Sequence, residues 1–331
     1  MENRFIYVDE MKGLAILFVC MGHLLGSHSV LGNLQPTLII IASFHMAFFF
    51  FLSGYINQKT HKIESKGVGT FVRKRINSLL IPHLFWLYLA PYFLYDTIPS
   101  SWNEAIGKLN FYPNVNEWFL PCLFIAIMFW MIQYIIMEKY FNSWKYKQII
   151  HLSSPAVLAI AGLVFNMYFL VIYAIYMGCF IFGDILSGSK DLQKFFMQRK
   201  VWAVSAIILC ISWKFYTPEL AGGMIYTLVK LLLYAICSFG ACVFFYNIFR
   251  QISIPKMISI PLQTWGKMSL VIYLLPIYLL PKDFIFPVNW TNTEINLFVL
   301  VIGILQCSIG GGIGELVMKI PGLSFIMFRK K

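Results

Sequence analysis

Charged residues are scarce in this chain, and their scarcity excludes the commonest class of protein. Only 12% of the 331 residues are charged, whereas 59% are apolar and the mean hydropathy is +0.73. A soluble globular domain has about 25% charged residues. The composition therefore excludes such a domain and predicts a polytopic membrane protein, which we expect to be all-α.

Patterns that hold metals or disulfides are also missing. The chain has seven cysteines, but none forms a CxxC pair or a Cys/His cluster at metal-binding spacing. Every cysteine lies inside an apolar run, where a thiol behaves as a small hydrophobic side chain. We therefore expect neither a disulfide framework nor a metal site.

Long hydrophilic blocks, low-complexity segments and repeats of fixed period are absent as well. The largest loop, at about 98–117, is too short for a separate domain. We expect one membrane domain over residues 1–331. No small-residue cleavage site follows the first apolar run, so this run should stay as an anchor.

Apolar segments of membrane-spanning length recur along the chain. A span needs about 20 mostly apolar residues, and about ten segments qualify. They are 10–31, 37–57, 77–97, 118–137, 148–165, 167–186, 201–217, 222–248, 268–281 and 295–317. The fifth, seventh and ninth are the weakest, and the ninth contains Pro276.

The distribution of the basic residues indicates how the chain is oriented in the membrane. With the N-terminus inside, 22 of the 26 Lys and Arg residues fall in cytoplasmic segments. The others are Lys108, Lys214 and Lys282 in outer loops and Lys230 within a span. This bias follows the positive-inside rule and predicts cytoplasmic termini. Because the net charge of +12 is not gathered on one exposed face, we expect no nucleic-acid partner.

Two histidines lie inside apolar segments near the N-terminus. His23 is deep in the first span and His45 is well inside the second. Ionisable residues at membrane depth are costly, about 2.5 to 3.5 kcal/mol for Asp, Lys or Arg, and mark functional sites by default. Histidine exchanges protons near neutral pH, although each ring could instead bond a neighbouring helix. We expect His28 and His61 to be solvated.

Helical spacing links His23 to charged residues at the inner edge of the first span. Lys12 and His23 are eleven residues apart, which places them on nearly the same helix face, about 16 Å apart along the axis. Asp9 lies one turn before Lys12. Antiparallel packing of the second span would place His45 at the depth of His23. The pattern suits a ligand with an anionic head in the cytoplasm and a long thin arm.

A basic cluster precedes the third span. Arg73, Lys74 and Arg75 lie where the positive-inside rule predicts basic residues. They also open a predicted helix, whose N-terminus favours anions. The cluster is therefore a candidate phosphate site.

Several motifs of the first 125 residues together resemble those of the acyltransferase-3 family of integral membrane acyltransferases. They are DEMKG with GH eleven residues after its lysine, FHMAFFFFLSGY, LLIPH after basic residues, and NEWFLPCLF. The resemblance implies transfer of an acyl group, usually acetyl from acetyl-CoA, to a hydroxyl of a cell-surface polysaccharide or its lipid-linked precursor. It also implies a multi-pass protein of the bacterial inner membrane, with membrane lipid around it and no permanently bound cofactor.

The resemblance also assigns roles to individual residues. It implies that His23 is catalytic, that Lys12 is essential although arginine is usual there, and that Arg75 binds the phosphates of the donor. Ser78 stands where a second arginine is expected, with Arg73 and Lys74 as substitutes. We expect His23 to act as a general base or as a transient acyl carrier, with Asp9, Lys12 and His45 as further catalytic candidates.

The remaining features carry weaker predictions. Glu117 and Trp118 open the fourth span on the outer side and are candidates for contact with the acceptor, although interfacial Trp is ordinary. The glycine run 310–314 indicates close helix packing. Lys230 receives no role.

Two rival functions come from other classes of membrane protein. A transporter or flippase of a lipid-linked glycan would be expected to show internal repeats with paired broken helices, and the sequence shows no such repeats. A polysaccharide polymerase would need a large outer loop for its catalytic groups. The loop here has about twenty residues, at 98–117.

Overall fold

Helices make up most of the described part of the protein, as its composition predicts. The computed structural model describes residues 6–28, 35–60, 67–89, 118–140, 144–215, 224–275, 279–281 and 284–320. Within these ranges there is no β-strand. The predicted all-α class is confirmed for this part of the chain.

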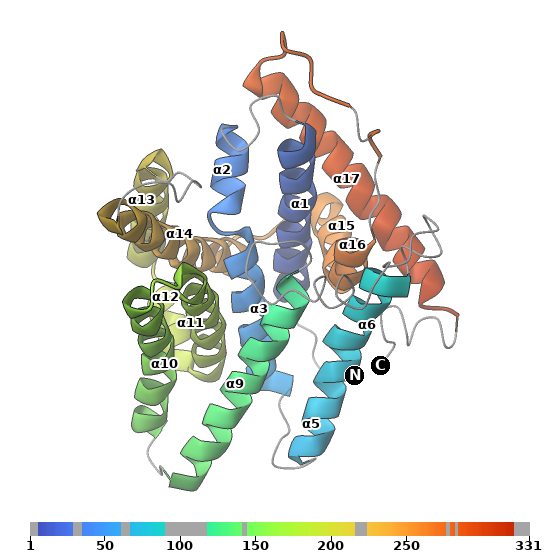
Figure 1. Cartoon of the computed structure of the whole chain (residues 1–331). Helices are drawn as coiled ribbons and strands as arrows, with labels where there is room; N and C mark the ends of the chain where they lie inside the picture. Colours follow the sequence, from blue (N-terminus) through green and yellow to red (C-terminus); the bar gives the residue numbers. More distant parts are fainter. Residues whose placement is uncertain are drawn as a thin grey trace. The chain divides into compact units, whose positions relative to one another are not determined.

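Figure 1 shows the helices in their order along the chain. They are α1 (Ile6–His28), α2 (Pro36–Ala42), α3 (His45–Thr60), α5 (Val68–Arg75), the π-helix η2 (Ile76–Leu80), α6 (Ile81–Leu84), the π-helix η3 (Phe85–Leu89), α9 (Phe119–Tyr140), α10 (Trp144–Val164), α11 (Tyr168–Gly188), α12 (Lys190–Phe196), α13 (Arg199–Phe215), α14 (Met224–Gln251), α15 (Lys256–Lys267), α16 (Ser269–Leu274) and α17 (Asn292–Val317).

Five of these helices are long and apolar enough to cross a membrane, counting only residues that the structure describes. They cover Pro36–Asn57, Phe119–Tyr140, Tyr168–Gly188, Tyr226–Gln251 and Asn292–Val317. Helices also lie at the other predicted segments, but the predicted total of about ten spans and the cytoplasmic termini remain predictions. The third predicted span is described only to residue 89, as the short helices α5 to η3.

The chain forms two compact units, and the boundary between them falls inside α3. Unit 1 comprises Met1–Leu52 and Ser189–Glu315, and unit 2 comprises Ser53–Gly188 and Leu316–Lys331. In unit 1, helix α1 packs against α15, and also against α2, α14 and α16. In unit 2, α10 and α11 form a hairpin, and α9 packs against both of them and against η2.

Glycines allow the helices of unit 1 to approach closely. A Cβ atom at Gly13 of α1 would overlap the Leu262 carbonyl of α15, and one at Gly266 of α15 would overlap the Asp9 carbonyl. These two contacts hold the α1 and α15 backbones against each other. In α17, a Cβ atom at Gly314 would lie 2.9 Å from the Val271 side chain, which confirms the predicted close packing there.

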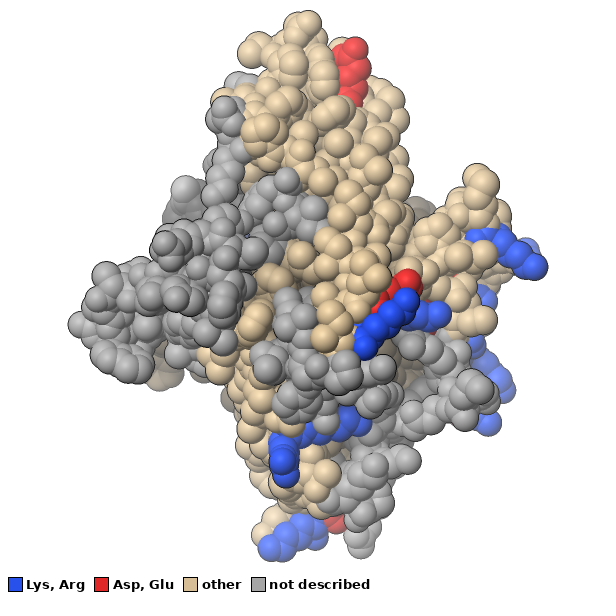
Figure 2. Space-filling view, turned by 90° about the vertical axis from the view of Figure 1, so that its right-hand side faces the viewer, with Lys and Arg blue, Asp and Glu red and all other residues tan. Residues whose placement is uncertain are grey.

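The surface of α17 shows how apolar the exterior is. Apolar side chains such as Leu297, Val301 and Leu305 are exposed along this helix. Figure 2 views the side of the molecule on which α17 lies in Figure 1, and most of the described surface there is uncharged. An apolar exterior of this extent is what a lipid bilayer covers.

The prediction that His28 is solvated is wrong. His28 ends α1 and is only 5% exposed. Its Nδ1 donates to the Phe284 carbonyl at 2.7 Å, and its ring packs edge-on against the rings of Phe284 and Phe286. The segment after the ninth predicted span returns to cover this end of α1, which hydropathy alone does not indicate.

Candidate active site

Helix α1 is continuous, so the spacing predicted for its functional residues holds. It runs from Ile6 to His28 without a break, which leaves Lys12 and His23 on nearly the same face. Asp9 is buried and Lys12 is half-buried. By surface area, His23 is exposed on this helix.

The N-terminal end of α1 carries a polar contact that sequence reasoning missed. Glu10 is 6% exposed and accepts a hydrogen bond from the Ser259 hydroxyl of α15. Gln263 donates to the same hydroxyl at 2.8 Å. With the glycine contacts, this network fixes the end of α1 that bears Asp9 and Lys12.

The structure brings the two predicted imidazoles together. His23 of α1 and His45 of α3 lie close enough for a direct electrostatic interaction. The prediction that antiparallel packing places these rings at similar depth is consistent with this proximity. Their catalytic roles remain predictions.

A backbone contact fixes the tautomer of His45. Its Nδ1 lies 2.8 Å from the Ile41 carbonyl oxygen. A carbonyl oxygen only accepts, so Nδ1 must be the donor. In the neutral ring, Nε2 then keeps its lone pair and can accept a proton. His45 is thus an imidazole of defined orientation, with a base pointing away from its own helix.

His45 begins a new helix in the middle of a predicted span. The sequence predicts one helix over 37–57, whereas α2 ends at Ala42 and α3 begins at His45. At the break, the Ser43 hydroxyl accepts from the Trp213 indole N–H at 3.0 Å, and the Ser43 carbonyl accepts from Ser238 at 3.2 Å. The Ser238 hydroxyl of α14 therefore bonds a backbone carbonyl at the interruption, and Trp213 of α13 bonds the Ser43 side chain.

An aromatic side chain fixes the other residue of the break. Phe44 is 2% exposed. Its ring centroid lies 5.5 Å from that of Phe18 in α1, 6.2 Å from that of Trp213 in α13 and 5.3 Å from that of Phe245 in α14. The break thus joins α1, α13 and α14 at the residue before His45.

The basic cluster of unit 2 separates into one half-buried and two exposed residues. The prediction that the cluster opens a helix is wrong, because all three residues lie in the last turn of α5. Arg73 and Lys74 are exposed there, whereas Arg75 is half-buried. The Arg75 guanidinium donates to the Asn57 side chain at 2.8 Å and lies 5.0 Å from the centroid of the Phe71 ring. Its Nε is buried without a hydrogen-bond partner among the described residues.

Charge persists on Arg75 despite this burial. Desolvation lowers the pKa of Arg75 to about 10, which leaves the guanidinium protonated at neutral pH. Ser78, predicted at the place of a second arginine, donates to the Arg75 carbonyl at 3.4 Å. The Ser78 hydroxyl is therefore bonded to its own helix.

Sequence reasoning missed a buried carboxyl group close to Asn57, the partner of Arg75. Asp184 of α11 is 7% exposed and accepts from the Trp130 indole N–H of α9 at 3.0 Å. It also lies near enough to the Asn57 side chain to interact with it electrostatically. The sequence does contain a signal for Asp184, because it is an ionisable residue within the predicted span 167–186.

The two candidates for acceptor contact have different outcomes. Trp118 is buried and stacks on Tyr176 of α11, with ring centroids 5.2 Å apart and planes inclined by 19°. This contact gives Trp118 a packing role in unit 2. Glu117 lies outside the described residues. Acceptor contact by either residue remains a prediction.

Comparison with known proteins decides the family. The model of a family described as an acyltransferase domain matches residues 5–310, nearly the whole chain. The chain belongs to the acyltransferase-3 family. No curated protein and no solved structure matches it.

Family membership makes the protein a multi-pass membrane acyltransferase. Within the described residues, no group of three or more His, Cys, Asp or Glu side chains is placed to hold a metal. In unit 1, the candidate reactive groups of this acyltransferase are the imidazoles of His23 and His45. In unit 2 they are a guanidinium bonded to the Asn57 amide and a buried carboxyl group near that amide.

Proposed function

We propose that this acyltransferase transfers an acetyl group from acetyl-CoA to a hydroxyl of a cell-surface polysaccharide or its lipid-linked precursor, in the bacterial inner membrane. The family match over residues 5–310 supports acyl transfer. The site assignment rests on the pair His23 and His45 on apolar helices. Ionisable residues at such positions are usually functional, because they are costly in a membrane.

The proposed reaction places His23 at the acceptor. Its imidazole takes the proton of the acceptor hydroxyl while the hydroxyl oxygen attacks the carbonyl carbon of the thioester. The carbon–sulfur bond breaks, and the imidazolium returns the proton to the leaving thiolate. In the second version of the step, an imidazole nitrogen first displaces the thiol and forms an acyl-imidazole, which the hydroxyl then attacks.

Arg75 is the proposed contact for the donor phosphates. Its guanidinium stays charged at neutral pH, and its buried Nε is a donor without a partner in the described part of the chain. A planar guanidinium suits phosphate oxygens. Exposed Arg73 and Lys74 add positive charge to the same helix end.

Acetyl transfer by purified protein tests the proposal. Protein in lipid nanodiscs receives radiolabelled acetyl-CoA and a polysaccharide acceptor, and transfer of label to the acceptor is measured. His23→Ala should lower the rate by about 10²- to 10⁴-fold, which is the usual contribution of a general base. Full activity in a correctly folded His23→Ala protein would refute the assignment.

His28→Asn is the matched control. It removes an imidazole from the same helix but keeps a donor for the Phe284 carbonyl, so activity should persist. Omitting the acceptor separates the two versions of the step. Label that stays on wild-type protein but not on His23→Ala indicates an acyl-imidazole, and unlabelled protein indicates a general base.

One structural feature favours a transporter of lipid-linked glycan as a second candidate. Unit 1 contains two interrupted helices, at Ser43–Phe44 between α2 and α3 and at Met268 between α15 and α16. Broken helices line the substrate sites of many transporters. Movement of glycan across vesicles without any loss of acetyl from acetyl-CoA would favour this second function.

A further inference from the structure

Lys230 of α14 is a buried cation to which the proposed chemistry gives no role. It is 3% exposed, and its Nζ has no hydrogen-bond partner within the described ranges. The Nζ atom lies 4.0 Å from the centroid of the Tyr226 ring. A cation–π contact of this kind stabilises an ammonium only in part. Ionisable residues inside membrane helices mark ligand sites and pathways.

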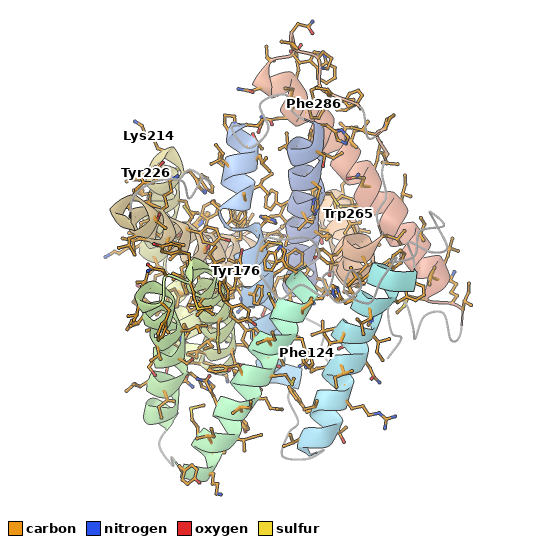
Figure 3. All side chains as sticks on the ribbon, viewed as in Figure 1. Phe124, Tyr176, Lys214, Tyr226, Trp265 and Phe286 are labelled. Carbon is orange, nitrogen blue, oxygen red and sulfur yellow. The ribbon has the colours of Figure 1, made fainter. Side chains whose placement is uncertain are left out.

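The ammonium is buried although the end of the span is near. The apolar part of α14 begins at Tyr226, so Lys230 lies about 6 Å into the span. A lysine at this depth usually extends its amine to the interface. Lys214, in the last turn of α13, is exposed, and Figure 3 shows Lys214 and Tyr226 at the same end of these two helices. Lys230 instead places its amine inside unit 1.

A row of buried polar residues connects Lys230 to the imidazole pair. Thr227, Lys230, Tyr234 and Ser238 are all buried, and their spacing of three, four and four residues places them on one face of α14. Ser238 donates to the Ser43 carbonyl, two residues before His45. Lys230 and Ser238 are about 12 Å apart along the helix axis. These buried polar side chains therefore link Lys230 to the helix break that precedes His45.

We propose that Lys230 binds an anionic oxygen group, a carboxylate or a phosphate, and thereby anchors the acceptor while its hydroxyl reaches the imidazoles. The assignment of the ligand as the acceptor rests on the proposed function. An ammonium is a compact charge that binds either group. The anion is supplied by an acidic sugar of the acceptor or by the phosphate of a membrane lipid.

Equilibrium binding without any acetyl donor tests this site. Protein in phosphatidylcholine nanodiscs is titrated with an oligosaccharide that carries a uronic acid, and with the same oligosaccharide after reduction of the carboxyl group. Wild-type protein should bind the acidic form more tightly. Lys230→Met should weaken that binding by about tenfold or more, as expected when one member of a buried charge pair is removed. Lys230→Arg should retain it.

Lys214→Met is the matched control, because it removes an exposed lysine from the same end of the α13–α14 hairpin. It should leave binding unchanged. Tyr226→Leu supplies a second variant if Lys230→Met does not fold. Tyr226 is 46% exposed, so its loss spares the core but should weaken acidic binding a few-fold.

A separate experiment tests whether a lipid phosphate is the anion bound at Lys230. Native mass spectrometry of protein from phosphatidylglycerol nanodiscs should show a retained lipid that Lys230→Met loses, if a lipid phosphate is the anion. The site is overturned if Lys230→Met keeps both the acidic preference and the lipid, or if Lys214→Met loses them equally. These binding experiments contain no acetyl donor. Their result can therefore be interpreted even if the protein transfers no acetyl group in the assay of the proposed function.

Discussion

The indole N–H of Trp130 donates to Oδ2 of Asp184 at 3.0 Å, inside unit 2. Asp184 also lies near the Asn57 side chain, which accepts from Arg75. Two hydrogen bonds and one electrostatic contact thus link a buried tryptophan to the guanidinium proposed to bind the donor. Buried polar groups of this kind influence one another strongly because the local dielectric is low.

Asp184→Ala should weaken donor binding through Asn57. Without Asp184, the Asn57 amide loses a polar neighbour, so the partner of Arg75 is held less firmly. We expect the KM for acetyl-CoA to rise about tenfold while kcat changes less, because the reacting groups lie elsewhere. Steady-state kinetics at varied acetyl-CoA would measure this split. Asp191→Ala, at an exposed site of α12, should change neither constant.

Arg75→Gln should raise the KM for acetyl-CoA more than Arg73→Gln does. Arg75 is half-buried and held by Asn57 and Phe71, whereas Arg73 is exposed. An ordered, partly desolvated charge binds an anion more strongly than an exposed one, which salt screens. The Arg73→Gln effect should therefore shrink at 0.5 M salt and the Arg75→Gln effect should persist. Equal effects of the two substitutions would remove the special role of Arg75.

Hydropathy was sufficient to predict where most helices lie. The predicted spans 118–137 and 167–186 correspond to α9 (Phe119–Tyr140) and α11 (Tyr168–Gly188), because twenty apolar residues leave the backbone no alternative in lipid. The polar chain from Trp130 to Arg75 could not be predicted this way. Its hydrogen bonds join residues that are distant in the sequence, and no single-helix pattern encodes such pairing.

The break before His45 also could not be predicted from the sequence. Neither Ser43 nor Phe44 is a proline or a glycine, the residues that usually mark a broken helix. The break is stabilised by Trp213 and Ser238, which are 170 and 195 residues away. His23 and His45 themselves could be chosen from the sequence, because an imidazole inside an apolar run is conspicuous.

Ser43→Ala should destabilise the break and reduce activity. It removes the acceptor of the Trp213 indole N–H and leaves that donor unpaired, which costs about 1 to 3 kcal/mol when the site is buried. Since Ser43 precedes His45 by two residues, the imidazole should also lose its fixed position. Thermal unfolding in detergent and acetyl transfer would both be measured. Ser308→Ala is the control, because this exposed hydroxyl bonds only to the carbonyl of Ile304 in its own helix.

Gly266→Ala should destabilise unit 1 and lower activity together. The added methyl group would overlap the Asp9 carbonyl, so α15 and α1 must separate. Overpacking of this kind costs about 1 to 3 kcal/mol, and about 2 to 4 °C in Tm for each kcal/mol in a unit of this size. Because α1 carries Asp9, Lys12 and His23, its displacement should also reduce acetyl transfer.

Gly312→Ala in α17 is the matched substitution with the opposite expectation. A methyl group there meets no described atom within 4 Å, and Gly312 is exposed. Alanine favours a helix over glycine by about 1 kcal/mol, so the Tm should stay equal or rise slightly and activity should be retained. Comparing the two variants therefore separates the effect of the backbone contact on stability from the effect of helix propensity. A Gly266→Ala protein as stable and active as the Gly312→Ala protein would mean that α1 and α15 do not touch at Asp9.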